Sequence, residues 1–401
     1  MSLTLTTAGE SHGPGLTAIV EGLPAGLELD REAINRDMAR RQLGHGRGGR
    51  MKIEKDAAEP TAGVRHGRTL GGPIALQVAN RDYANWEERM NPWPVEADVP
   101  PVHMPRPGHA DLVGAWKYGH DDVRNVLERA SARETAARVA GGALAKAFLS
   151  ALGVEIRSHV TQIGPVTAPQ RDRPLVVADF EGVDEDPVRC LDAEASKAMV
   201  AHITAERKNN ESIGGTYEVV VYGLAPGIGS HVSWTERLDG RLAQAICSIQ
   251  AHKGVEFGDG FDLAATPGSQ AQDEIFGVED VADGDERTGA VRRRTNHAGG
   301  LEGGMTNGQP LVVRAVVKPI PTITKPLRSV DLATGEPAKA LRERTDNCVV
   351  PAAGVVGEAM IAFVLASAYR EKFGGDHIDD VRAALAAYQE RIGWVGAPIG
   401  A

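Results

Sequence analysis

The segment that most constrains the fold is an apolar run from Gly354 to Tyr369. A membrane-spanning helix needs about 20 predominantly apolar residues, whereas this run is shorter and contains the charged Glu358. We therefore predict a helix in the core of a soluble protein rather than a membrane span. The helix should begin near Pro351, because proline is favoured in the first turn, and should end at Gly374.

Three further helices are predicted from capping residues and hydrophobic periodicity. Asp30 is a suitable N-cap for a helix that continues to about Arg41 and ends at Gly44. Ser131 and Glu134 have the spacing of a capping box, and apolar residues recur after them at helical intervals. The third helix is expected from about Arg237 to His252.

Alternating or β-branched segments predict strands. These segments are Leu3–Thr7, Leu16–Val20, Tyr217–Tyr222 and Leu311–Lys318. The strands and helices do not alternate regularly, which favours an α+β fold over a doubly wound parallel sheet. The length of 401 residues by itself suggests two or three domains. The Pro- and Asp-rich stretch 168–187 is expected to be a surface excursion.

Composition excludes several classes of protein. The formal net charge of -10 disfavours binding to nucleic acid or to an anionic membrane. Three cysteines stand far apart, at positions 190, 247 and 348, without the spacing of a disulfide framework or a zinc site. The N-terminus shows no basic start followed by an apolar run, so no signal peptide is expected. We predict reduced thiols in a cytoplasmic protein.

A local basic cluster stands out in this acidic chain. It comprises Arg36, Arg40, Arg41, Arg47, Arg50, Lys52 and Lys55. Arginines interleaved with glycine suit phosphate and carboxylate groups, although a solvated loop explains the composition equally well. Gly44, Gly46 and Gly49 match the dinucleotide-binding spacing, but they follow a predicted helix instead of a strand, so we reject that motif. The single Arg-Gly-Gly-Arg element at 47–50 is weak evidence for RNA binding.

Other candidate residues lie in glycine-flanked turns and at a helix start. His12 and His109 are suited to proton transfer near neutral pH, although most turn histidines are structural. Arg129 and Arg133 flank the predicted start of the Ser131 helix, where backbone amides favour an anion. Simple capping is the alternative there. The Gly-rich stretch 295–308 suggests either a backbone-lined pocket or a flexible loop.

Taken together and in order, these blocks closely resemble those of chorismate synthases over nearly the whole chain. The matching blocks are Gly9-Glu-Ser-His-Gly13, the Gly/Arg loop 44–50, Arg106-Pro-Gly-His-Ala-Asp111, Arg129-Ala-Ser-Ala-Arg-Glu-Thr135, 250–261, 296–308, 318–322 and Arg344-x-Asp346. The resemblance implies one α+β domain spanning 1–401, in which two antiparallel sheets enclose a helical core as a β-α-β sandwich. It also implies a homotetramer, and it overrides the domain number suggested by length.

The activity implied by the resemblance is an anti-1,4-elimination that depends on reduced FMN. Phosphate leaves 5-enolpyruvylshikimate 3-phosphate to give chorismate, the last common step of aromatic amino-acid biosynthesis in the shikimate pathway. The enzyme would be a carbon–oxygen lyase with no net redox change. A separate flavin reductase is the expected partner, and NADPH is expected only as a source of reducing equivalents.

The resemblance also implies roles for individual residues. His109 would protonate the leaving phosphate, His12 would protonate reduced FMN, and Asp346 would tune flavin N5. The residues expected around FMN are Arg129, Ala130, Ser131, Gln250, Ala251, Gly303, Lys318, Pro319, Ile320, Pro321, Thr322 and Arg344. The residues expected to bind substrate are Arg50, Arg106, Arg133 and Arg344, and those that match positions associated with NADPH are Arg41 and Arg47. Because no Rossmann context surrounds the last two, substrate or flavin phosphate suits them equally well.

The individual residues are also compatible with two other classes of protein. A phosphosugar or shikimate-type transferase would need the same arginines but would not bind FMN. A nucleic-acid-binding module would use the Arg/Gly loop and would bind RNA in a salt-sensitive way.

Overall fold

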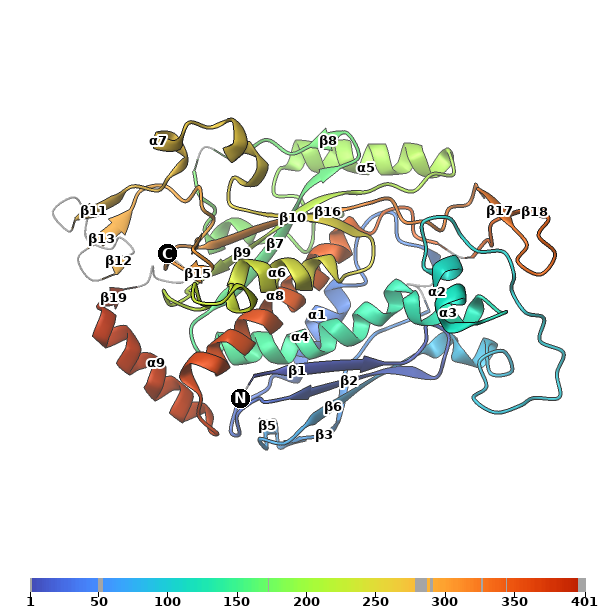
Figure 1. Cartoon of the computed structure of the whole chain (residues 1–401), viewed down its shortest axis with the longest axis horizontal. Helices are drawn as coiled ribbons and strands as arrows, with labels where there is room; N and C mark the ends of the chain where they lie inside the picture. Colours follow the sequence, from blue (N-terminus) through green and yellow to red (C-terminus); the bar gives the residue numbers. More distant parts are fainter. Residues whose placement is uncertain are drawn as a thin grey trace.

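The computed structural model describes residues 2–49, 53–171, 173–277, 287–288, 291–325, 327–343 and 345–395. Within them the chain is a mixture of helix and sheet, as predicted (Figure 1). Two larger sheets carry most of the strand residues, and their neighbouring strands pair in antiparallel fashion. The first sheet has the order β1 (Thr4–Ala8), β2 (Gly15–Glu21), β6 (Ile74–Ala79) and β3 (Glu59–Ala62). The second has the order β10 (His252–Phe257), β16 (Leu311–Val317), β9 (Gly215–Tyr222), β7 (Glu155–Ile163) and β8 (Val166–Thr167).

Two long helices, α4 (Thr135–Ser150) and α8 (Val350–Phe373), pack against each other between these sheets (Figure 1). Helix α4 lies on β1, β2 and β6, and α8 lies on β7 and β9. Glycine permits this close packing, because a Cβ at Gly142 would lie 2.4 Å from the Cβ of Ala359. A Cβ at Gly357 would likewise lie 2.5 Å from the hydroxyl of Tyr217 on β9. Larger residues at either position would force the layers apart.

Helix α8 is the core helix that the apolar run predicts. It is long and apolar enough to pass a composition test for a membrane span, and it is the one such helix among the described residues. However, 89% of its most apolar window is buried inside the protein. Pro351 lies in its first turn and Gly374 follows its last residue, so both predicted ends are confirmed.

The other elements surround these layers. The remaining helices are α1 (Arg31–Arg40), α2 (Asp111–Tyr118), α3 (Arg124–Ala130), α5 (Ala193–Lys208), α6 (Leu238–Cys247), α7 (Gly268–Ala271) and α9 (Ile378–Ile392). The remaining strands are β4 (Val64–Arg65), β5 (Arg68–Thr69), β11 (Ile275–Gly277), β12 (Arg287–Thr288), β13 (Val291–Arg293), β14 (Leu301–Glu302), β15 (Met305–Thr306), β17 (Arg328–Val330), β18 (Pro337–Lys339) and β19 (Trp394–Val395). Helices α2 and α3 lie near one end of α4, beside the β17–β18 hairpin (Figure 1).

The predicted helix at Ser131 begins later than expected. Ser131 caps a 3-10 turn, 132–134, by accepting a hydrogen bond from the backbone N–H of Arg133, and α4 starts only at Thr135. The capping box is wrong, because Glu134 is used elsewhere. Its carboxylate accepts hydrogen bonds from Thr7 at 2.6 Å and from Arg138 at 2.9 Å. Tertiary contacts therefore outcompete the local cap.

Helix α1 is confirmed, and the predicted end of one other helix is corrected. Helix α1 is N-capped by Asp30 and ends at Arg40 with Arg41 as its C-cap, as the prediction of an end at about Arg41 requires. Helix α6 ends at Cys247 and so falls short of the predicted end at about His252. Ala251 has a left-handed backbone with φ +67°, which no helix can include, and β10 begins directly after it at His252. The apolar periodicity continues past the helix because Ile249 packs in the core outside the helix.

The stretch 168–187 is more than a surface excursion. Phe180 and Val183 are buried against Val220 and Tyr222 of β9, so the stretch covers part of the outer face of the second sheet. Its Asp184 also accepts a hydrogen bond from Nε of Arg40 at 2.8 Å.

Candidate active site

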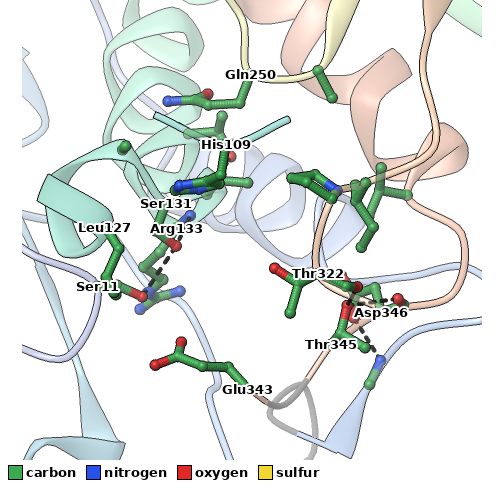
Figure 2. A pocket seen from close by; sticks show the side chains of 18 of the residues that line it. Ser11, His109, Leu127, Ser131, Arg133, Gln250, Thr322, Glu343, Thr345 and Asp346 are labelled. Carbon is green, nitrogen blue, oxygen red and sulfur yellow. Dashed lines mark hydrogen bonds between the residues drawn. The ribbon is translucent and has the colours of Figure 1, made fainter. Parts of the chain in front are cut away.

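A cavity of ≈ 870 Å³ gathers most of the residues singled out in the sequence. Its size falls within the usual range for small-molecule sites, about 300–1,000 Å³. Ser11, Ser131 and Arg133 lie on one side, and Thr322, Thr345 and Asp346 lie on the other (Figure 2). The start of α8 adds an apolar wall through Ala352, Ala353 and Val356. The cavity is therefore built from segments that are far apart in the sequence.

His12 lies in the β1–β2 connection, and its imidazole is nearly buried. Its Nδ1 lies 3.0 Å from each carboxylate oxygen of Glu128 on α3, and its backbone N–H donates to Glu128 Oε2 at 2.8 Å. The ring stacks on the indole of Trp86 with centroids 4.0 Å apart. The Asn80 amide donates hydrogen bonds to the carbonyls of Glu10, Ser11 and Gly13 and so holds the connection in place.

His109 is held by residues of its own turn. Its Nδ1 lies 2.5 Å from Oδ1 of Asp111, the first residue of α2. Arg106 binds the same carboxylate through Nε at 2.8 Å and Nη2 at 3.1 Å, and it donates from Nη1 to Thr322 at 2.9 Å. The short motif thus folds back on itself and attaches to the 318–322 segment.

The two carboxylates beside these histidines are held ionised. Burial opposes the ionisation of Asp111, but hydrogen bonds from His109 and Arg106 outweigh it and bring the pKa of Asp111 well below its usual value. Burial likewise opposes the ionisation of Glu128, and hydrogen bonds from His12 together with the charge of Arg124 lower the pKa of Glu128. Both groups are therefore acceptors in the neutral pH range.

Arg41 and Arg133 lie on the cavity wall and share one buried carboxylate. Arg133 Nη1 donates to both oxygens of Asp56 at 2.7 Å, and Arg41 Nη1 donates to Asp56 Oδ2 at 3.2 Å. Burial lowers the pKa of Arg41 to about 9, against the opposing charge of Asp56. Arg41 also donates to the hydroxyl of Thr135 at the start of α4. A second buried carboxylate, Glu54, lies 3.8 Å from Arg133 Nη2. Buried carboxylates thus hold both guanidinium groups in place at the cavity wall.

Arg47 of the Gly/Arg loop and Asp346 of the Arg344-x-Asp346 motif meet on the opposite side of the cavity. The two motifs are far apart in the sequence. Arg47 Nη1 lies 2.9 Å from Asp346 Oδ2. Asp346 Oδ1 also accepts the backbone N–H of Gly48, which fixes the backbone of the Gly/Arg loop beside Asp346. A Cβ at Gly48 would lie 2.6 Å from the carbonyl of Thr345, so glycine is required there.

The structure brings most predicted FMN residues to the cavity, but not all. Those that line it are Ala130, Ser131, Gln250, Ala251, Lys318, Ile320, Pro321 and Thr322. Arg129, Pro319 and Gly303 are not among the lining residues. Arg129 instead donates to the Thr7 carbonyl at 2.8 Å, and Gly303 is in the β14–β15 turn. Arg50 and Arg344 lie outside the described residues.

Several residues that support the site were not predicted from the sequence, among them Asp56, Trp86, Asp111, Arg124 and Glu128. Asp111 stands two positions after His109 in the same motif, so its role could have been inferred. Glu128 is 116 positions from His12, and nothing in the local sequence joins the two.

The described residues contain no group of three or more His, Cys, Asp or Glu side chains that could hold a metal ion. The cavity combines cationic groups, two histidine–carboxylate pairs and apolar surface. Such a site can bind a polyanion and move protons to and from it.

Known proteins resemble the chain over nearly its whole length. The family model for chorismate synthase matches residues 3–369. The chorismate synthase of Rubrobacter xylanophilus is 55% identical over 98% of this chain and 98% of that protein. The Acidothermus cellulolyticus enzyme is 55% identical over 96% of this chain and 98% of that protein. A crystal structure of chorismate synthase matches with a TM-score of 0.77 and 41% identity, covering 98% of each chain. The chain therefore belongs to the chorismate synthase family.

Proposed function

We propose that this cavity binds reduced FMN together with 5-enolpyruvylshikimate 3-phosphate and eliminates phosphate from the latter to give chorismate. As a member of its family, the enzyme is a carbon–oxygen lyase that acts at the last common step of aromatic amino-acid biosynthesis. The observation that carries the proposal is the convergence of His12, His109 and Asp346 on one cationic cavity. Family membership supports this function over the two alternative classes, a transferase and a nucleic-acid-binding module.

The donor set of the cavity fits FMN. Ala352, Ala353 and Val356 supply an apolar surface for a flat ring system, and Lys318 supplies a cation at the segment predicted to bind the cofactor. The hydroxyl-bearing residues Ser131 and Thr322 also line the cavity. When bound, reduced FMN supplies a group that releases electron density and takes it back with a hydrogen, so the elimination has no net redox change.

The protein's own residues have three tasks. Arg106 and Arg133 hold and orient the anionic substrate, together with Arg47 on the facing side. His109 donates a proton to the departing phosphate, which would otherwise leave as a more basic anion. His12 holds a proton at the cofactor side, and Asp346 fixes the local charge and the position of Gly48. The apolar wall excludes water from the reacting groups.

We also propose the finer family properties for this chain. These are a single domain with the β-α-β sandwich architecture, a homotetramer and a cytoplasmic location. A main cluster of buried residues drawn from both large sheets and from α4 and α8 supports one domain. The cysteines at 190, 247 and 348 are unpaired with one another, which supports a reducing compartment. We propose NADPH only as a source of reducing equivalents, through a separate flavin reductase.

The test is an anaerobic assay with the pure protein. With reduced FMN, the substrate should yield chorismate and phosphate in equal amounts while the amount of reduced flavin stays constant. Oxidised FMN alone should support no turnover. Turnover with oxidised FMN, or stoichiometric loss of reduced flavin, would contradict the proposal.

A further inference from the structure

The environment of Glu128 determines which nitrogen of His12 carries hydrogen. Glu128 accepts from the His12 backbone N–H at 2.8 Å and from Arg124 Nη1 at 2.9 Å. It is buried, and its pKa is lowered, so it has no hydrogen to donate. The ring contact at 3.0 Å must therefore run from Nδ1–H of His12 to the carboxylate.

The same reasoning applies to His109. Asp111 accepts from the backbone N–H of Arg106 at 3.0 Å and from two guanidinium nitrogens at 2.8 and 3.1 Å. Its side chain is fully buried. Arg106 Nη2 also lies 3.1 Å from Nδ1 and 3.4 Å from Nε2 of His109. The shorter contact decides the tautomer, because a nitrogen without hydrogen would not approach an ionised carboxylate to 2.5 Å. His109 therefore donates from Nδ1 to Asp111, and Arg106 Nη2 donates to Asp111 and not to the ring.

We propose that Glu128 and Asp111 are positioning residues that fix His12 and His109 as Nδ1–H tautomers, so that each histidine exchanges protons through Nε2. The catalytic role of these histidines rests on the proposed function. The assignment of hydrogen to Nδ1 does not, because it can be measured without any turnover. A hydrogen-bonded carboxylate is the usual means of fixing the tautomer of a working histidine.

With hydrogen fixed on Nδ1, His109 can transfer a proton from Nε2 to the leaving phosphate. His109 as imidazolium carries hydrogen on both nitrogens. The Nε2–H bond breaks and its electron pair stays on Nε2, while the proton bonds to an oxygen of the leaving phosphate. Nδ1–H stays hydrogen-bonded to Asp111 throughout, and Asp111 stabilises the imidazolium before the transfer.

His12 has a second restraint on its ring plane. Trp86 stacks on it with an interplanar angle of 27°, and the guanidinium of Arg124 lies 5.1 Å from the centroid of the same indole. Arg124 thereby contacts both Trp86 and Glu128. The orientation of Nε2 is thus set by a group of three side chains around His12.

The variants that test the inference are Glu128→Gln and Asp111→Asn. Each replaces a carboxylate by an amide of equal size, which has only one acceptor oxygen. Glu128 receives three donors and Asp111 four, so the amide NH₂ must face at least one N–H group. The pair Glu218–His159 provides a matched control, because it joins β9 to β7 at 3.3 Å and neither residue lines the cavity.

Two measurements on the full-length protein decide the matter. Nitrogen-15 NMR of histidine-labelled protein should show His12 and His109 with hydrogen on Nδ1, and each signal should change in the variant of its own carboxylate. In the anaerobic assay with reduced FMN, each variant should lower kcat about 10–100-fold while substrate affinity changes less than about threefold. Glu218→Gln should leave kcat and both cavity histidine signals unchanged.

A double variant adds a sharper check. Because Glu128 acts through His12, adding Glu128→Gln to His12→Ala should change kcat less than about twofold. A further loss of tenfold or more would overturn the positioning role of Glu128. Hydrogen on Nε2 instead of Nδ1 in the neutral rings of an active wild-type enzyme would overturn the inference and leave the proposed function intact. An inactive wild-type enzyme with Nδ1–H rings would contradict the proposed function alone.

Discussion

Glu358 on α8 accepts a hydrogen bond from Arg40 of α1 at each of its carboxylate oxygens, both at 2.8 Å. The carboxylate is fully buried in the middle of the core helix. Lys146 on α4 and Ser158 on β7 donate to it as well, each at 2.5 Å. One side chain thus links the two central helices to α1 and to the second sheet.

We predict that Glu358→Gln lowers the free energy of unfolding by about 3–5 kcal/mol. The reason is that Arg40, Lys146 and Arg189 would keep only Asp37 and Asp184 as counterions, which leaves one positive charge in the interior uncompensated. Chemical denaturation of the two proteins measures the difference. Glu194→Gln is the control, since its partner Lys197 is exposed and such pairs contribute about 0–1 kcal/mol. If Glu358→Gln and Glu194→Gln lowered the free energy of unfolding equally, the buried position of Glu358 would not explain its contribution.

The same carboxylate predicts a dependence of stability on acid. Burial opposes the ionisation of Glu358, but Arg40 and Lys146 outweigh it and place its pKa well below the usual 4.5. Its contribution to stability is therefore fully present above about pH 4.5 and is lost as the pH falls through the lowered pKa. The stability difference between wild type and Glu358→Gln should shrink below pH 4.5. A difference that grows in acid would show that the pKa is raised instead.

His12→Ala and His109→Ala should each slow turnover by roughly 10²–10⁴-fold, the usual contribution of a general acid or base. Both proteins should fold, because the Gly-flanked turns carry little core packing. His109→Ala should lose phosphate release while still forming the reduced ternary complex, and His12→Ala should alter the spectrum of bound reduced flavin. Stopped-flow spectra and a phosphate-release assay separate the two. The remote His159→Ala is the control, and near-normal turnover in both cavity variants would make these histidines structural.

Asp346→Asn should reduce turnover about 10²-fold or more while FMN binding changes little. The amide can still accept the Gly48 N–H, but it no longer offers a charge to Arg47. Single-turnover kinetics together with FMN titration measure the two effects separately. A loss of FMN affinity as large as the loss of turnover would mean that Asp346 only maintains the shape of the loop.

The pure protein should lack a flavin reductase activity of its own. NADPH plus FMN in oxygen-free buffer should give little chorismate until dithionite or a separate reductase is added. The motivation is the Gly44–Gly49 loop, which follows helix α1 and does not connect a strand to a helix. Full NADPH-driven turnover would instead assign a cofactor role to Arg41 and Arg47.

The sequence by itself determined the elements whose signals are local. The core helix α8 could be predicted because apolar residues, Pro351 and Gly374 mark its body and both its ends. The strands β1, β2, β9 and β16 were predicted to within about two residues from their side-chain patterns. The order of the short motifs was also sufficient to identify the family.

Only the tertiary structure decided which residues meet. Glu134 was predicted to form a capping box with Ser131, but its carboxylate accepts hydrogen bonds from Thr7 and Gln250, which are 127 and 116 positions away in the sequence. Neither the contact of Glu128 with His12 nor that of Asp56 with Arg41 and Arg133 could be predicted from the sequence. Helical or strand periodicity relates only residues within one element, whereas these contacts join different segments of the chain. Folding removes water from these charged side chains, and a buried charge is stable only when an opposite charge or a hydrogen bond compensates it. The partner of each charge is therefore set by the folded structure. Local patterns therefore determined the helices and strands, and burial determined the chemistry of the site.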